Sequence, residues 1–225
     1  MKKTLLSLWV FFGLISSVSA QWTSPGDGTT YTLPDLVAAS DGTVTNGPNG
    51  FLINNDLTIA ANDILLIDDQ VSRIDAPGVL ITIQGTLTCA NTERVRLYGA
   101  ETNQFSMRFE NASDCLLQKM YLTDGAGIKL IESNVTFNDV KFVYFTTDYC
   151  SAVIDIFNCD PIINSCFFML NKGAAISSPA NGQSSPQITY NEFDANVDGL
   201  NMPQINLGPG SDDTIRIVGN NIHGT

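Results

Sequence analysis

Two stretches of the sequence, PIINSCFFMLN at residues 161–171 and PQITYNEFDAN at residues 186–196, are near copies of one another at an offset of 25 residues. They share Pro, Ile, Phe and Asn at matching places. The line returns as IRIVGNNIHGT at residues 215–225, where Ile217 lies 29 residues after Ile188. A period in the twenties that drifts by a few residues indicates stacked coils whose corners carry loops of different length.

Weaker copies extend the repeat upstream. Phe137, Val140 and Phe142 match Ile163, Cys166 and Phe168 at an offset of 26; Leu117, Met120 and Leu122 match the first of these sets at an offset of 20; Leu57-Thr58-Ile59 matches Ile81-Thr82-Ile83 at an offset of 24. Stretches such as GVLITIQGTLT (residues 78–88) alternate apolar and polar residues and are rich in β-branched side chains, which is typical of strands. The sequence therefore predicts an all-β solenoid in which short parallel strands stack on the coil below and inward residues form a shared core.

One corner slot of the repeat changes character along the chain. It is filled in order by Met120, Val140, Cys166, Asn191 and Asn220, so it is apolar early and amide late. An Asn at a sharp corner is expected to adopt a left-handed backbone and to hydrogen-bond neighbouring backbone groups, and stacked amides can also bond one another along the axis.

The line I-x-x-N-x-F/I, at Ile188, Asn191 and Phe193 and again at Ile217, Asn220 and Ile222, resembles the coil repeat of the right-handed parallel β-helix superfamily. That superfamily includes pectate lyases, polygalacturonases and many exported bacterial proteins of unassigned function. The resemblance covers roughly residues 50–225 and implies a right-handed parallel β-helix. It says little about function, because the matching residues are those that build coils.

The chain begins MKKTLLSLWVFFGLISSVSAQW, with two lysines, an apolar run and small residues before Gln21. This pattern predicts a secretory signal peptide over residues 1–20, too short and too polar at its end to span a membrane. We expect a secreted or cell-surface protein with an N-terminal cap and lead-in over residues 21–50 and coils over residues 51–225. Pro34 offers a helix start within the cap, and GDG at residues 26–28 is read as a turn.

Composition restricts the partners. Without the signal peptide, 9 basic residues face 23 acidic ones, which argues against nucleic acid and anionic membranes as partners. Five cysteines follow the signal peptide, an odd number without CxxC or zinc spacing. We expect buried core thiols rather than a disulfide framework, and no metal site.

The other end of the chain carries the apolar pair Ile217 and Ile222 with no capping pattern after it. Repeat proteins need terminal caps for solubility. This favours the hypothesis that the chain is truncated at its C-terminus and that further coils or domains follow.

Stacking also aligns the outward residues into a strip of two columns. The first column is Tyr121, Lys141, Phe167, Glu192 and Asn221; the second is Thr123, Val143, Met169, Asp194 and His223. Three interpretations are open: a sugar-binding groove with stacking rings and carboxylates, a face covered by a long loop that buries Phe167 and Met169, or a protein-contact patch. The leading hypothesis is a β-helix that contacts carbohydrate or a partner without catalysis, with Tyr121 and Phe167 as ligand-binding candidates.

The alternative is a polysaccharide lyase or glycoside hydrolase. Its catalytic candidates are Lys141, Glu192 and Asp194, with no cofactor except Ca²⁺ if the chemistry is that of a lyase. Lys141 and Glu192 are expected two coils apart, about 9–10 Å on the strand spacing. His223, the single histidine, is expected to be exposed and without a role, which leaves no histidine triad or zinc site.

A partial polygalacturonase-like pattern adds little to the enzyme hypothesis. Asn196, Asp198 and Gly199 resemble the N-x-D-G line of that family, and the pair Asp212-Asp213 follows. The family's Gly-His-Gly and R-x-K lines are incomplete here. The pair is better explained as part of the turn before the strand at residues 215–218.

Overall fold

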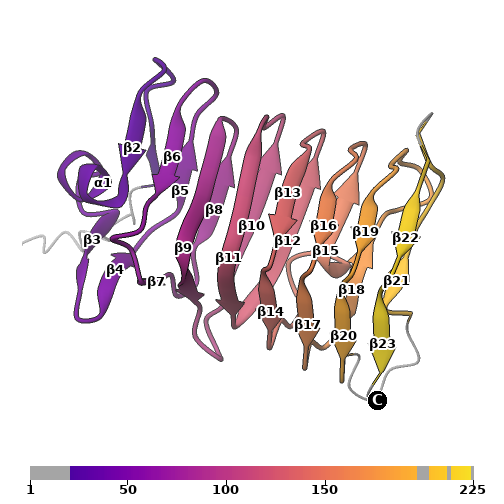
Figure 1. Ribbon diagram of the computed structural model, residues 1–225. Coiled ribbons are helices and arrows are strands. Elements are labelled where there is room, and N and C mark those ends of the chain that lie inside the picture. Colours follow the sequence, from indigo (N-terminus) through magenta and orange to yellow (C-terminus); the bar gives the residue numbers. More distant parts are fainter. Residues whose placement is uncertain (1–20, 197–202, 212–213, 224–225) are drawn as a thin grey trace, which may run out of the picture.

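The computed structural model describes residues 21–196, 203–211 and 214–223. It is an all-β parallel solenoid of about seven coils, seen from the side in Figure 1. The predicted all-β parallel solenoid is therefore confirmed for the described part of the chain. Each repeat offset read from the sequence is a real strand pairing: Leu57 lies beside Ile81, Phe137 beside Ile163, and Ile188 beside Ile217.

The coils have three faces. The first face consists of β1 (Trp22–Thr23), β5 (Leu57–Ile59), β8 (Leu80–Ile83), β10 (Phe105–Glu110), β12 (Gly125–Ile131), β15 (Ala152–Phe157), β18 (Ala174–Ser177) and β21 (Ile205–Asn206). The second face consists of β2 (Thr30–Thr32), β6 (Ile64–Ile67), the first parts of β9 (Thr86–Tyr98) and β11 (Cys115–Thr123), β13 (Val135–Asn138), β16 (Ile162–Asn164), β19 (Gln187–Thr189) and β22 (Arg216–Val218). The third face consists of β3 (Val44–Gly47), β4 (Gly50–Ile53), β7 (Arg73–Asp75), the last parts of β9 and β11, β14 (Lys141–Val143), β17 (Phe167–Met169), β20 (Glu192–Asp194) and β23 (Asn221–His223).

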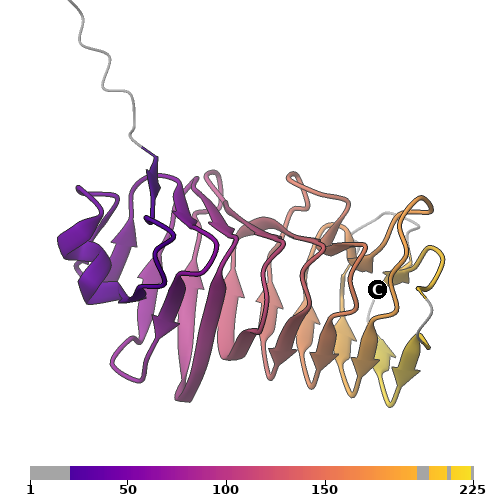
Figure 2. The same cartoon turned by 90° about the horizontal axis from the view of Figure 1, so that it is seen from above.

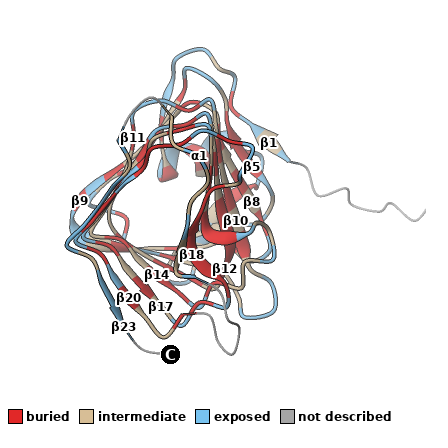
Figure 3. Cartoon of the chain, turned by 90° about the vertical axis from the view of Figure 1, so that its right-hand side faces the viewer, coloured by how far each residue is buried: buried red, intermediate tan, exposed pale blue. Residues whose placement is uncertain are grey.

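The core runs along the axis of the solenoid and is built from one cluster of buried side chains. Buried residues lie on all three faces (Figure 3). Its clearest element is a stack of phenylalanines on the third face. The ring centroids of Phe142 and Phe168 are 4.6 Å apart, and those of Phe168 and Phe193 are 5.0 Å apart with a 7° interplanar angle. All three side chains are fully buried. The inward register predicted for Phe168 and Phe193 is confirmed.

The corners are made by residues with a left-handed backbone. Between the second and third faces this corner column comprises Lys119, Asp139, Ser165, Tyr190 and Gly219, with φ between 52° and 68°. At the end of the third face a second corner column comprises Asp124, Tyr144, Leu170 and Ala195, with φ between 47° and 59°. The expectation that Asn191 is itself left-handed is wrong, because Tyr190 makes the turn and Asn191 follows it with its side chain pointing inward.

The inward asparagines form ladders, as expected for the slot of Asn191. The Asn191 side chain accepts a hydrogen bond from the backbone N–H of Cys166 (2.8 Å) and donates to the carbonyl of Ile163 (2.9 Å) and to the side chain of Asn220 (3.0 Å). A second ladder follows the other corner, where Asn171 donates to the Asn196 side chain at 2.7 Å. Each amide thus satisfies backbone groups that the corner removes from the strand ladders.

The first coil uses a carboxylate instead. Asp63 is fully buried and accepts hydrogen bonds from the backbone N–H groups of Gly26 (2.8 Å), Gly28 (2.9 Å) and Thr29 (3.0 Å). Gly26 and Gly28 have φ of 79° and 88°, which bends the loop around the carboxylate and explains why glycines flank Asp27. The turn predicted for residues 26–28 is confirmed.

The two ends of the described coils differ. Helix α1 (Leu33–Ala39) lies at the N-terminal end (Figure 2). Its Leu33 and Leu36 are buried, and Thr32 and Asp35 form a capping box. The helix that Pro34 suggested is thus present and begins one residue earlier. At the other end Ile217 and Ile222 are 49% and 56% exposed although they continue inward columns. No helix in the described residues is long and apolar enough to cross a membrane.

Candidate functional site

The strip has the register that the sequence predicted, but the expectation that all of its side chains face outward is wrong, because Thr123 and Val143 are buried. Tyr121, Lys141, Phe167, Glu192 and Asn221 pair in order along the third face, and so do Thr123, Val143, Met169, Asp194 and His223. Upstream, Arg96 pairs with Tyr121, and Tyr98 pairs with Thr123. The structure therefore extends both columns of the strip toward the N-terminal coils.

An open pocket of about 640 Å³ lies where this strip meets the second corner column. Its lining is Tyr98, Gly99, Ala100, Glu101, Gln104, Tyr121, Thr123, Asp124, Tyr144, Thr146, Leu170 and Lys172. Because three tyrosines contribute to it, we call it the tyrosine pocket. Among the sequence-based candidates, only Tyr121 lines it.

The three tyrosines come from successive coils. Tyr98 ends β9, Tyr121 lies in β11, and Tyr144 follows β14 at the corner. The Tyr98 and Tyr121 ring centroids are 6.3 Å apart with the planes tilted by 44°. The Arg73 guanidinium lies 4.1 Å from the Tyr98 ring centroid, which fixes that ring from the other side. Tyr144 is 51% exposed, so its ring is free to cover a ligand.

Polar groups surround the rings. The Thr123 hydroxyl donates to the Asp124 carboxylate at 3.0 Å, and the Thr146 hydroxyl donates to the Gln104 side chain at 2.6 Å. Burial raises the pKa of the Tyr121 hydroxyl, and the neighbouring Tyr98, Tyr144 and Asp124 groups raise it further. Tyr121 is therefore a neutral hydroxyl at physiological pH and can both donate and accept hydrogen bonds. Rings, hydroxyls and carboxylates on one open surface are the groups that bind the faces and hydroxyls of sugars.

The other ligand-binding candidate, Phe167, lies on the strip but does not line the pocket. The Lys141 ammonium lies 5.8 Å from the Phe167 ring centroid, so these neighbours contact one another. Phe167 and Met169 are half-buried. Part of each side chain remains accessible, so neither residue is fully buried.

The acidic candidates lie at the far end of the strip. His223 Nε2 is 3.0 Å from a carboxylate oxygen of Glu192, and its Nδ1 is 3.5 Å from a carboxylate oxygen of Asp194. His223 is exposed as expected, and it contacts both carboxylates across the last strand pair. Lys141 pairs with Phe167 and Phe167 with Glu192, which places Lys141 and Glu192 two coils apart as predicted.

The remaining motifs add no chemistry in the described part of the chain. Asp198, Gly199 and the Asp212-Asp213 pair of the polygalacturonase-like line lie outside the described residues, as does the predicted signal peptide. All five cysteines are free thiols, four of them buried, which confirms core thiols over a disulfide framework. No group of three or more histidine, cysteine or acidic residues in the described ranges is arranged to hold a metal ion.

The sequence did not reveal Tyr98 and Tyr144 as site residues. Tyr98 lies in the second outward column, one coil before Thr123, and extending the strip upstream from Tyr121 finds it. Tyr144 occupies a corner position equivalent to Asp124 and Leu170. The residue type at this corner differs from coil to coil, so the sequence gives no sign that Tyr144 belongs to a site. Tyr98, Tyr121 and Tyr144 lie on successive coils and come together only in the folded solenoid.

Comparison of the chain with protein-family models, with curated proteins and with solved structures found no match in any of the three.

Proposed function

We propose that this protein is an exported, right-handed β-solenoid that binds extracellular carbohydrate in the tyrosine pocket without cleaving it. The observation that carries the proposal is the convergence of Tyr98, Tyr121 and Tyr144 on one open pocket of about 640 Å³. The volume falls in the range typical of small-ligand sites. The signal sequence at residues 1–20 supports the export route.

The pocket suits sugars for a physical reason. Aromatic rings stack on the apolar faces of sugar rings, and the side chains of Asp124, Gln104 and Thr146 offer acceptors and donors for hydroxyl groups. The pocket is open toward solvent, so an extended chain can lie in it without its ends being enclosed. A monosaccharide would leave most of the aromatic surface uncovered.

Binding is tested by calorimetric titration of the protein, lacking residues 1–20, with a panel of oligosaccharides, comparing Tyr144→Ala with wild type. Loss of one exposed stacking ring is expected to weaken binding about tenfold. Tyr190→Ala is the matched control, because Tyr190 is also exposed and left-handed, with φ of 57° against 59° for Tyr144, but lies at the other corner column. Equal affinities of wild type and Tyr144→Ala, or no binding by the panel, would contradict the proposal.

A second candidate function is polysaccharide cleavage at the far end of the strip. The observation that favours it is the cluster of Glu192, His223 and Asp194, which places a titratable base between two carboxylates. Incubation with polysaccharides, with and without Ca²⁺, would be followed by new reducing ends and by absorbance of unsaturated products. Turnover that disappears in Glu192→Ala or Lys141→Ala would make the protein an enzyme. Turnover that survives both variants would point to a contaminant.

A further inference from the structure

The first outward column is cationic beside the tyrosine pocket. From β7 to β14 it reads Arg73, Arg96, Tyr121 and Lys141, on adjacent strands. Adjacent strands in a sheet are about 4.8 Å apart, so Arg96 and Lys141 emerge on either side of Tyr121 within about 10 Å of each other. Lys172, which lines the pocket itself, is a further cation beside this column.

These cations differ in how they are paired. Arg73 forms an ion pair with Asp75 at 2.8 Å. Within the described residues, by contrast, no carboxylate lies within ion-pair distance of Arg96, Lys141 or Lys172. Lys141 has the Phe167 ring as its neighbour, and the Arg96 guanidinium acts on the Tyr121 hydroxyl, whose pKa it lowers against the larger effect of burial. Arg96 and Lys141 do not line the tyrosine pocket themselves, but they flank Tyr121, which does.

Cations on neighbouring strands destabilise the sheet, and acidic side chains placed beside them would remove this cost. Like charges opposite one another on neighbouring strands destabilise a sheet, and Arg73 and Arg96 are such a pair. The chain has 23 acidic residues against 11 basic ones, so carboxylates are abundant. Arg94 and Arg108, for example, are each paired with a carboxylate. Cations left without a carboxylate beside an open aromatic pocket are expected where a ligand supplies the negative charge.

We infer that the ligand of the tyrosine pocket is a glycan carrying anionic substituents, sulfate or carboxylate, and that Arg96 and Lys141 bind those groups on either side of Tyr121. The inference rests on the proposed function. Asp124 and Glu101, the carboxylates of the lining, accept hydrogen bonds from the hydroxyl groups of the sugar. Asp124 already accepts one hydrogen bond, from the Thr123 hydroxyl. The cations decide which sugars bind, while the rings supply the shared stacking surface.

The inference is tested with matched pairs of glycans, one sulfated and one unsulfated galactan and one polyuronate and its reduced neutral form, titrated at about 50 and 500 mM salt. We expect wild type to bind each anionic member at least tenfold more tightly than its neutral counterpart, with most of the preference lost at high salt. The variant Arg96→Gln/Lys141→Gln should bind both members of a pair alike. Whether sulfate or carboxylate is preferred separates the two sources of charge.

The control is Lys129→Gln/Arg216→Gln, which removes the same charge. Lys129 and Arg216 also have no ion pair among the described residues, but they lie on the first and second faces. This control should keep the preference for anionic glycans. A control that loses the preference equally, or a wild type that binds neutral and anionic members equally well, overturns the inference while the proposed function stands.

If no glycan binds, the proposed function fails, and a direct probe then decides the cation site. Inorganic sulfate at millimolar concentration should raise the melting temperature of wild type more than that of Arg96→Gln/Lys141→Gln. The same rise in both proteins would overturn the inference as well. A rise confined to wild type would leave an anion site that does not serve carbohydrate.

Discussion

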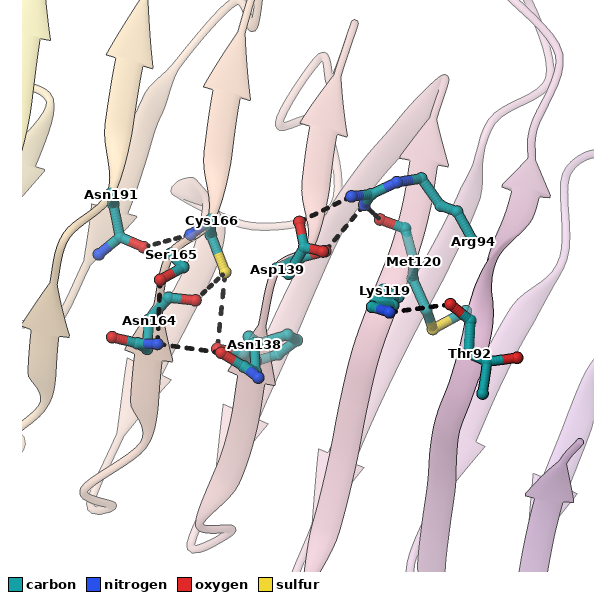
Figure 4. Close-up of polar contacts among 11 residues, drawn as sticks. Thr92, Arg94, Lys119, Met120, Asn138, Asp139, Asn164, Ser165, Cys166 and Asn191 are labelled. Atoms are coloured by element: carbon teal, nitrogen blue, oxygen red, sulfur yellow. Dashed lines mark hydrogen bonds and ion pairs between the residues drawn. The ribbon is translucent and has the colours of Figure 1, made fainter. Parts of the chain in front are cut away.

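The corner between the second and third faces is held from outside in the middle coils and from inside in the late coils (Figure 4). In the middle coils the Arg94 guanidinium lies on the surface and donates to the carbonyls of Met120 (3.0 Å) and Asp139 (2.8 Å) and to the Asp139 carboxylate (2.7 Å). In the late coils the buried amide of Asn191 serves the backbone of Cys166 and Ile163.

The difference shows that a corner has one requirement and several solutions. A left-handed residue turns the chain and leaves backbone groups that no strand ladder satisfies. When the slot after it is apolar, as with Met120 and Val140, the partners must come from outside the coil. When the slot is an Asn, the partners come from inside, and the same amide links one coil to the next. Asp63 is a third solution, in which a buried carboxylate collects three backbone N–H groups of the first coil.

The largest effect is expected from Phe193→Asp, which tests whether the late coils depend on their apolar stack as well as on their amides. The change places an unpaired charge in a fully buried position against Phe168, 5.0 Å away between ring centroids. We expect a loss of more than about 4 kcal/mol, measured by chemical denaturation, or failure to fold. Glu192→Ala, the exposed neighbour, should change stability by less than about 0.5 kcal/mol. Similar losses in both variants would mean that the inward register is wrong.

Asn191→Ala tests the inside solution directly. It leaves the Cys166 N–H and the Ile163 carbonyl without their partner in a buried corner, so we expect a loss of about 2–4 kcal/mol in the free energy of unfolding. The matched control is Asn138→Ala on the outer surface, where Asn138 accepts one hydrogen bond from Asn164 at 2.9 Å and water can replace it. The control should lose less than about 1 kcal/mol. If the two losses were alike, the inward ladder would contribute no more than a surface contact.

Asp63→Asn separates the carboxylate corner from the amide corners by pH. Burial raises the pKa of Asp63, but the hydrogen bonds from Ser24, Gly26, Gly28 and Thr29 together lower it by more than burial raises it. The pKa of Asp63 therefore lies below its ordinary value. A lowered pKa in the folded state stabilises the fold above the ordinary value of about 3.9, and that contribution is lost as the pH falls through the folded pKa. We expect Asp63→Asn to cost about 2 kcal/mol at pH 7 and progressively less as the pH falls below about 4.

The measurement is urea denaturation of wild type and variant at pH 7, 4 and 2.5. Asn191→Ala serves as the reference, because an amide does not titrate and its cost should stay nearly constant over the same range. An Asp63→Asn cost that is as large at pH 2.5 as at pH 7 would show that the carboxylate charge contributes nothing to holding residues 26–29.

The sequence was sufficient for the register but not for the corners or the pocket. Ile188, Asn191 and Phe193 repeat because each coil places the same side chain in the same environment, so periodicity carries the fold. Arg94 does not repeat, and it acts on Asp139, 45 residues away, so no period predicts it. The tyrosine pocket depends on the conformation of the loop that carries Gln104 and on the position of the corner residue Tyr144. Loop conformation is set by contacts that the repeat does not encode.

The smallest effect is expected from Arg94→Ala, and it decides whether the outside solution is weaker than the inside one. The side chain of Arg94 is 30% exposed, so water can replace its hydrogen bonds to the Met120 and Asp139 carbonyls when it is removed. We therefore expect a loss of about 1 kcal/mol in denaturation, clearly less than for Asn191→Ala. Arg94→Lys should recover little of it, because an ammonium lacks the planar fork that reaches two carbonyls and a carboxylate together. Arg108→Ala is the control: Arg108 also pairs with an acidic side chain, Glu110 at 2.8 Å, but within its own strand, and it should change stability by less than Arg94→Ala. A loss for Arg94→Ala as large as for Asn191→Ala would show that solvent does not enter this corner, and that the two solutions hold the coils equally firmly.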